Sequence, residues 1–398
     1  MHPFYRVALA GSALAIALSA CNGNGSTTTA TNTPGGVRTP QAFVLKKNIT
    51  LPGVPPATGT FSFDIGFVDP AAGQYYLADR TTKGIDVIDL ASLTYLRSAG
   101  AGTFTGLGTP AGAGVVANSG GPNGVVSNGS GILFAGDGDS TLKVLNANTG
   151  ALLATVPNAN PYSGPNLPAI CGGSGAPTTG TANLRLDELA LDPTDNVIFA
   201  VNDASCPPYG TFYSAAPPYN VIASIAFPTA NAGAEQPTWD PGQKKFIMAF
   251  PATVANPGGE IDLIDPISHQ ITATLPEQSC NANGTALGKN ETLFLGCSGT
   301  AQLLTINATN GATISSIPGV GGADEVWYNP TADRFYAASS NNLASSTLSG
   351  PFLVVTDGAG RLIASFPTSA GAHSVAVDPA TENTFVPQRA LGISVFSH

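Results

Sequence analysis

The sequence is poor in charge and in chemically reactive side chains. Only 10% of the 398 residues are charged, and His, Trp and Met number four, two and two. There is no G-x-S-x-G, P-loop or H-E-x-x-H motif, so these nucleophile, nucleotide and zinc signatures are excluded. The formal net charge of −10 disfavours a nucleic-acid partner, whose backbone is also negative. A cation, a basic peptide or an uncharged ligand fits this charge better.

The apolar run near the N-terminus is short. Val7–Ser19 follows the basic Arg6 and is too short to span a bilayer stably, so Met1–Ala20 predicts a secretory signal peptide. The run ends in Leu18-Ser19-Ala20-Cys21, which resembles the lipobox of bacterial lipoproteins. In that family the chain is cut before the cysteine, which then carries the lipid. The alternative is a plain secretory signal in which Cys21 is incidental.

The lipobox resemblance implies a subcellular location. Cys21 would attach the protein to a membrane, since several acyl chains suffice for stable anchoring. Asn22 stands where Asp would retain an enteric lipoprotein at the inner membrane, so the resemblance implies the outer membrane of a bacterial cell envelope. Residues 21–42 are polar and rich in Gly and Thr, which predicts a flexible tether between the signal (1–20) and a folded part (43–398).

Turn-forming residues are abundant, and one pattern recurs. Gly (47) and Pro (32) favour many short strands. Residues 322–367 contain four short runs, Val326–Tyr328, Arg334–Ala338, Phe352–Thr356 and Arg361–Phe366, which predict four strands joined by turns. The first turn of such a unit recurs seven times, at Asp69-Pro70, Ser127-Asn128, Asp192-Pro193, Asp240-Pro241, Gly288-Lys289, Asn329-Pro330 and Asp378-Pro379.

A four-stranded unit that recurs at this spacing is typical of a propeller blade. The sequence therefore predicts an all-β, seven-bladed β-propeller. The seventh unit stops after its third strand, and a spare strand-like segment at 43–52 precedes the first unit. We expect 43–52 to complete the last blade and close the ring, because closure removes an exposed sheet edge.

The repeats resemble those of YVTN/YncE-like β-propeller proteins. The resemblance rests on the D-P-x-x-x turns, on turns such as Asn146–Gly150 and Asn307–Gly311, and on the repeat start His373–Pro379. It covers 43–398 and implies architecture only, because such folds host binding proteins, lactonases, lyases and quinoproteins. Long segments at 99–121, 158–185 and 204–219 have no counterpart in a minimal repeat and are expected to be loops.

In a propeller, the loops that enter the inner strands and those that follow the second strands share one face, which we call the mouth face. We expect the three long loops there, and the Asp-Pro and Asn-Pro turns on the opposite turn face. Polar residues that precede the turns should ring the channel mouth. The acidic residues of this ring are the candidate metal ligands: Asp64, Asp187, Glu188, Glu235, Asp324 and Glu325.

Carboxylates near one axis repel each other unless a cation, water or Arg offsets them. One hypothesis is a Ca²⁺ or Mg²⁺ site, because hard cations prefer oxygen ligands. The alternative is a solvated polar channel whose carboxylates cap loop amides. His373 is a candidate general base, although no neighbouring motif supplies a nucleophile.

Four cysteines besides Cys21 suggest disulfides in an exported chain. Cys171 and Cys206 flank the first two strands of the third unit, and Cys280 and Cys297 occupy the corresponding places in the fifth. This register favours the pairs Cys171–Cys206 and Cys280–Cys297. Metal binding is the rival interpretation, but no CxxC spacing supports it.

Two functions remain open. The first is an envelope lipoprotein that binds an unknown protein or small molecule through its loop-rich face. The second is a metal-dependent hydrolase or lyase, similar to propeller lactonases. The only tryptophans, Trp239 and Trp327, fall on predicted inner strands and are expected to pack in the core, which disfavours a quinone cofactor.

Overall fold

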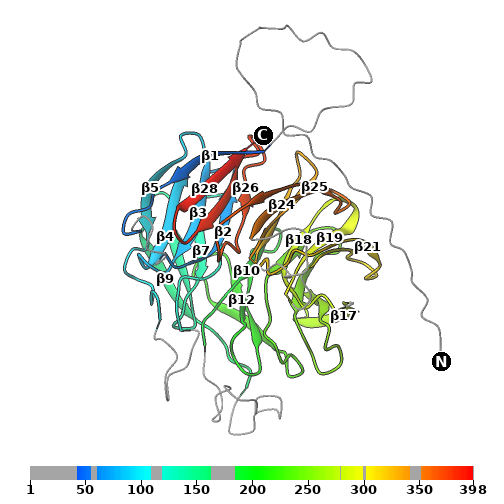
Figure 1. Cartoon of the computed structure of the whole chain (residues 1–398). Helices are drawn as coiled ribbons and strands as arrows, with labels where there is room; N and C mark the ends of the chain where they lie inside the picture. Colours follow the sequence, from blue (N-terminus) through cyan, green and yellow to red (C-terminus); the bar gives the residue numbers. More distant parts are fainter. Residues whose placement is uncertain are drawn as a thin grey trace, which may run out of the picture. The chain divides into compact units, whose positions relative to one another are not determined.

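The computed structural model describes residues 43–54, 61–108, 119–162, 184–277, 279–298, 302–340 and 351–397. Within these ranges the chain forms seven four-stranded antiparallel sheets, arranged as the blades of a seven-bladed propeller (Figure 1). The predicted fold class is therefore confirmed. The one helical element in the described part is a 3₁₀ turn, η2 (Lys289–Glu291). None of the helices described there has the length and apolar character needed to cross a membrane.

In blades one to six the four strands follow each other in chain order, from the channel outward. Blade one contains β2 (Phe63–Asp69), β3 (Gln74–Asp79), β4 (Gly84–Asp89) and β5 (Thr94–Ala99). Blade two contains β6 (Val125–Ser127), β7 (Ile132–Gly136), β8 (Thr141–Asn146) and β9 (Leu152–Pro157). Blade three contains β10 (Leu189–Asp192), β11 (Val197–Asn202), β12 (Tyr209–Ser214) and β13 (Val221–Ala226).

The next three blades repeat this order. Blade four contains β14 (Pro237–Asp240), β15 (Lys245–Phe250), β16 (Glu260–Asp265) and β17 (Gln270–Pro276). Blade five contains β18 (Ala282–Leu287), β19 (Thr292–Cys297), β20 (Gln302–Asn307) and β21 (Thr313–Pro318). Blade six contains β22 (Val326–Asn329), β23 (Arg334–Ser339), β24 (Phe352–Asp357) and β25 (Leu362–Pro367).

The two ends of the folded chain build blade seven together. Its strands are β26 (Ala376–Val377), β27 (Thr384–Gln388), β28 (Gly392–Ser397) and β1 (Val44–Ile49). β1 pairs antiparallel with β28, from Val44 opposite Ser397 to Ile49 opposite Ile393. Figure 1 shows the blue β1 beside the red β28. The expectation that a segment within 43–52 completes the last blade is confirmed.

Burial along each blade explains the order of its residue types. The second and third strands, such as β3 and β4, are buried along nearly their whole length, because neighbouring blades cover both of their faces. The fourth strands, such as β5, alternate between exposed and partly buried positions. Several fourth strands end in an exposed proline, which an edge strand tolerates because no further strand needs its missing N–H.

Seven apolar clusters hold neighbouring blades together. Each cluster among the described residues draws its side chains from two adjacent blades, and together they account for all seven interfaces. At the interface of blades seven and one, Phe385 stacks on Tyr75 with ring centroids 4.7 Å apart. Phe43, beside β1, packs against Tyr336 and Phe366 of blade six. Burial of apolar surface between blades therefore continues around the whole ring.

The turns after the inner strands have a local cause. Asp69 Oδ1 accepts hydrogen bonds from the N–H groups of Ala71 and Ala72, both at 3.0 Å. Asp240 and Asn329 do the same for the residues two and three positions later. An Asp or Asn side chain that binds the backbone ahead of it fixes such a turn. These turns are structural, as the sequence indicated.

One expected loop is a strand. Residues 204–219 were predicted as an insertion on the mouth face, but Tyr209–Ser214 forms β12, which pairs with both β11 and β13. Proline pairs on either side, Pro207-Pro208 and Pro217-Pro218, are typical of loops. They made this short strand-forming segment look like part of a loop. Blade three is therefore a complete four-stranded blade.

Candidate functional site at the channel mouth

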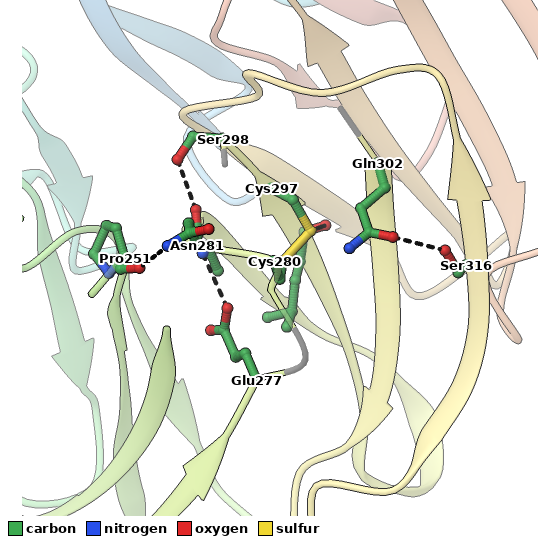
Figure 2. Close-up of a disulfide and its surroundings, with 10 residues drawn as sticks. Pro251, Glu277, Cys280, Asn281, Cys297, Ser298, Gln302 and Ser316 are labelled. Carbon is green, nitrogen blue, oxygen red and sulfur yellow. Dashed lines mark hydrogen bonds between the residues drawn. A yellow bond between two sulfur atoms is a disulfide. The ribbon is translucent and has the colours of Figure 1, made fainter. Parts of the chain in front are cut away.

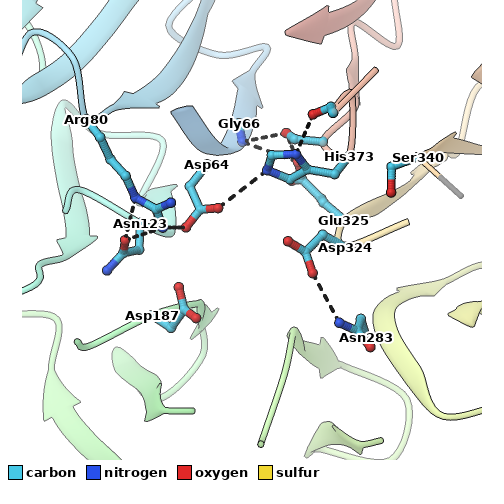
Figure 3. A network of polar contacts seen from close by, with 12 residues as sticks. Asp64, Gly66, Arg80, Asn123, Asp187, Asn283, Asp324, Glu325, Ser340 and His373 are labelled. Atoms are coloured by element: carbon cyan, nitrogen blue, oxygen red, sulfur yellow. Dashed lines mark hydrogen bonds and ion pairs between the residues drawn. The ribbon is translucent and has the colours of Figure 1, made fainter. Parts of the chain in front are cut away.

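The mouth is built where the chain enters each inner strand. Asp64 lies at the start of β2, and Asp187, Glu235, Asp324 and His373 lie just before their inner strands. Because the blades are arranged radially, these starting ends converge on the channel axis. Figure 3 shows the side chains of Asp64, Asp187, Asp324 and His373 gathered around one space.

Asp64 is the centre of one polar network. Its carboxylate forms an ion pair with Arg80, whose Nε donates to Asn123 Oδ1 at 3.1 Å (Figure 3). Its other oxygen lies 3.5 Å from His373 Nε2. Burial alone would raise the pKa of Asp64, but Arg80, with His373 and Arg185, lowers it to about 2. Asp64 is therefore ionised at neutral pH and anchors one side of the mouth.

His373 is held on three sides. Its Nδ1 lies 2.7 Å from the carbonyl oxygen of Gly371, and its ring stacks on Phe63 with centroids 4.9 Å apart. Burial would lower the pKa of His373, but the hydrogen bond to Asp64 and the charges of Asp324 and Asp64 outweigh burial and raise it. Both ring nitrogens face oxygen acceptors, so the arrangement favours the protonated imidazolium.

Arg185 ties a second part of the mouth together. Its Nη2 lies 2.6 Å from Asp187 Oδ2 and 3.0 Å from Asp203 Oδ2, and its Nε donates to Asp203 Oδ1 at 3.2 Å. Asp203 follows the second strand of its blade, whereas Asp187 precedes the first strand. The two loop sets that the sequence assigned to one face therefore meet through this arginine.

Two glutamates lie deeper in the channel and differ sharply. Glu325 Oε2 accepts hydrogen bonds from Gly66 N–H (3.2 Å), Ser374 Oγ (2.5 Å) and Val375 N–H (3.3 Å). Glu188 is 4% exposed, and its Oε2 has no hydrogen-bond partner among the described residues. Burial raises the pKa of both carboxyls, and nearby acids, Asp324 foremost, add to the effect at Glu188.

Two groups of side chains could hold a cation. Asp64, Asp324 and His373 can bring one ligand atom each within 4.8 Å of the others, and so can Glu188, Glu235 and Asp324. The all-carboxylate group suits a hard cation such as Ca²⁺ or Mg²⁺. Asp324 is shared by both groups and also accepts a hydrogen bond from Asn283 Nδ2 at 3.2 Å.

The long loop after blade one is fastened to the mouth face. Asp137, which follows β7, accepts hydrogen bonds from the N–H and hydroxyl of Thr105 at 3.1 and 2.7 Å. Thr105 belongs to the predicted loop 99–121, of which 99–108 and 119–121 are described. A bridge between Gly106 and Gly121 closes its described ends. Of the loop 158–185, residues 163–183 lie outside the described part.

One of the two expected disulfides lies wholly within the described residues and is confirmed. Cys280 and Cys297 are bonded across the start of β18 and the end of β19, close to Glu277 (Figure 2). Cys171 lies outside the described residues, so its pairing with Cys206 stays a prediction. Cys21 also lies outside them, and its lipid attachment likewise stays a prediction.

A cavity of about 470 Å³ occupies the channel itself. Glu188, Gln236 and Glu325 line it beneath the mouth, and Asn128 and Pro193 line it on the side of the turn face. Trp239 and Trp327 pack against neighbouring cores but also line this cavity and are only partly buried. The sequence placed both tryptophans on inner strands but did not reveal that they face the channel.

Comparisons with known proteins agree with this architecture and go no further. No family model matches the sequence. No curated protein matches it either. Among solved structures, a chain in a crystal structure of the mitotic checkpoint complex is similar, with a TM-score of 0.59 and 12% sequence identity over 98% of this chain and 99% of that one. Identity this low shows a shared fold alone.

The fold therefore defines the class: the chain is a seven-bladed β-propeller protein. Propellers commonly serve as interaction modules, and the same fold carries many unrelated activities. What this chain does must be argued from the mouth and the channel.

Proposed function

We propose that this propeller is a binding protein of the bacterial cell envelope, anchored through Cys21, that holds its partner on the mouth face. The state of His373 carries the proposal. Both of its ring nitrogens are engaged, by Gly371 O at 2.7 Å and by Asp64 at 3.5 Å, so neither is free to take a proton from a substrate. A general base needs such a free nitrogen within reach of the proton.

The rest of the mouth supports binding rather than turnover. Arg80 is held by Asp64 and Asn123, and Arg185 by Asp187 and Asp203. Side chains fixed in this way form a rigid polar surface, which reduces the conformational entropy lost when a partner docks. Ser374, the hydroxyl next to His373, donates its proton to Glu325 and is not poised as a nucleophile.

The proposed location in the cell envelope rests on the lipobox-like sequence Leu18–Cys21. We expect cells given labelled palmitate to incorporate it into the protein and Cys21→Ser to abolish the label. Labelling that survives this substitution would contradict anchoring at Cys21.

A metal-dependent hydrolase or lyase is the second candidate, favoured by the two groups that meet at Asp324. Metal analysis of the purified protein and a lactone-hydrolysis screen separate the two functions. The binding proposal predicts no turnover, with or without added Ca²⁺ or Mg²⁺. Turnover that is lost in Asp324→Asn but kept in the control Asp195→Asn, an exposed turn residue, would contradict it.

A further inference from the structure

The channel cavity extends from the acids beneath the mouth toward the turn face and is a second candidate site. Its wall toward the turn face is apolar and aromatic, and six partly buried side chains form it: Phe67, Leu191, Trp239, Leu287, Trp327 and Tyr328. Their partial exposure contrasts with the burial of Ile65, Val125 and Leu189 further in. The volume of about 470 Å³ lies in the range of small-molecule pockets, which are mostly apolar with a few polar groups.

The end of the cavity beneath the mouth holds a polar group that nothing in the described part of the chain satisfies. Glu188 lines the cavity, is 4% exposed, and its Oε2 has no partner. Glu325, the other acid at this end, already accepts three hydrogen bonds. A buried, unpaired carboxyl oxygen is costly, because it has lost water and gained nothing in return.

The charge around this end is unbalanced. Ligand atoms of Glu188, Glu235 and Asp324 lie within 4.8 Å of one another, and no Lys or Arg forms an ion pair with any of these three among the described residues. The guanidinium groups of the mouth network, Arg80 and Arg185, are already engaged by other carboxylates. A positive charge at Glu188 would therefore be attracted by several acids and opposed by few cations.

We propose that the channel binds an organic amine, which enters from the turn face. Its ammonium group displaces the proton that burial favours on Glu188, which passes to solvent, and donates to the resulting carboxylate. Its apolar body lies against Trp239 and Trp327. Charge-assisted hydrogen bonds to a carboxylate are about twice as strong as neutral ones. Indole rings add apolar contact and attract a cation through their negative faces. The apolar part of this site lies toward the turn face, away from the proposed partner on the mouth face.

Intrinsic fluorescence tests the proposal directly, because both tryptophans of the chain line the cavity. The full chain is titrated with 2-phenylethylamine and, separately, with the neutral analogue 2-phenylethanol. We expect a saturable change in tryptophan emission with the amine. The alcohol should bind at least tenfold more weakly, because it lacks the ammonium charge.

Two substitutions locate the effect. Glu188→Gln keeps the shape of the side chain and should remove most of the preference for the amine over the alcohol. Asp262→Asn, at a buried carboxyl of β16 away from the cavity, should leave both affinities unchanged. Should Glu188→Gln fail to fold, the comparison of amine with alcohol on the unaltered protein still decides the question.

Three results would overturn the proposal. One is equal affinity for the amine and the alcohol, which would mean that the cavity binds neutral apolar molecules. Another is the absence of a saturable change with the amine at millimolar concentration. The third is displacement of the amine by equimolar Ca²⁺, which would make an inorganic cation the occupant.

Discussion

At the scale of residues, the carboxyl groups of this protein differ by what surrounds them rather than by how deeply they lie. Glu325 and Glu188 are 1% and 4% exposed, yet within the described part of the chain Glu325 accepts three hydrogen bonds and Glu188 Oε2 accepts none. Glu325 therefore joins blades one, six and seven, whereas Glu188 is left available to a ligand. The sequence places both residues before inner strands but cannot show which oxygen lacks a donor.

Glu277 should make the protein less stable as the pH rises. Burial, aided by Glu260, raises its pKa to about 8, although its carboxyl accepts a hydrogen bond from Ala282 N–H. The unfolded chain loses this proton above about pH 4.5 and the folded protein only near pH 8, so the free energy of unfolding falls across this window. Below it both states are protonated and the effect is absent.

The substitution Glu277→Gln removes the titration and keeps an acceptor for Ala282. At pH 8 we expect the variant's free energy of unfolding in urea to exceed that of the unaltered protein by about 1–3 kcal/mol. At pH 4 the two free energies should be similar. Asp195→Asn, at an exposed carboxyl, is the control and should change neither value. Identical pH dependence in the Glu277→Gln and unaltered proteins would contradict this account.

At the scale of elements, the sequence predicts the strands of blade six to within a residue. The expected run Arg334–Ala338 became β23 (Arg334–Ser339), because short apolar runs between Asx turns leave little choice of register. The same reasoning missed β12, whose ends are marked by proline pairs. It also failed to predict that Trp239 and Trp327 line the channel. Both faces of an inner strand are apolar, so the alternation of residue types cannot show which face is turned toward the channel.

The Cys280–Cys297 disulfide should stabilise blade five. The two cysteines are 17 residues apart, and a cross-link over a loop of this length stabilises a protein by about 3 kcal/mol. Cys280→Ala/Cys297→Ala should lower the free energy of unfolding in urea by about that amount. Under reducing conditions both proteins lack the cross-link, so the difference should shrink. A difference that persists in full would mean that packing, not the cross-link, is responsible.

β1 should be essential to the closed ring. Removing residues 43–52 takes away the partner of β28 and the buried side chains of Phe43, Ile49 and Leu51. We expect a loss of at least about 3 kcal/mol, comparable to deleting one large core side chain, and a marked drop in the thermal midpoint. Removing residues 22–41 instead keeps β1 and should leave the midpoint unchanged. Equal midpoints for the 43–52 deletion and the intact protein would contradict the role of β1.

At the scale of the whole molecule, the ring separates two surfaces. The mouth face carries the polar network of Asp64, Arg80, Arg185 and His373, together with the loop 99–108. The turn face carries the Asx turns and the apolar part of the channel cavity. The repeat pattern of the sequence predicts both faces, but the cavity between them depends on side-chain directions that only the assembled ring fixes.

The most direct test of the central claim compares the two faces. Leu107 on the mouth face and Ile267 on the turn face are both exposed apolar residues, at 64% and 77%. A photo-crosslinking amino acid is placed at one position or the other, in cells that produce the protein. We predict that position 107 yields a specific crosslinked partner and position 267 does not. Crosslinking to the same partner from both positions, or from 267 alone, would contradict binding through the mouth face.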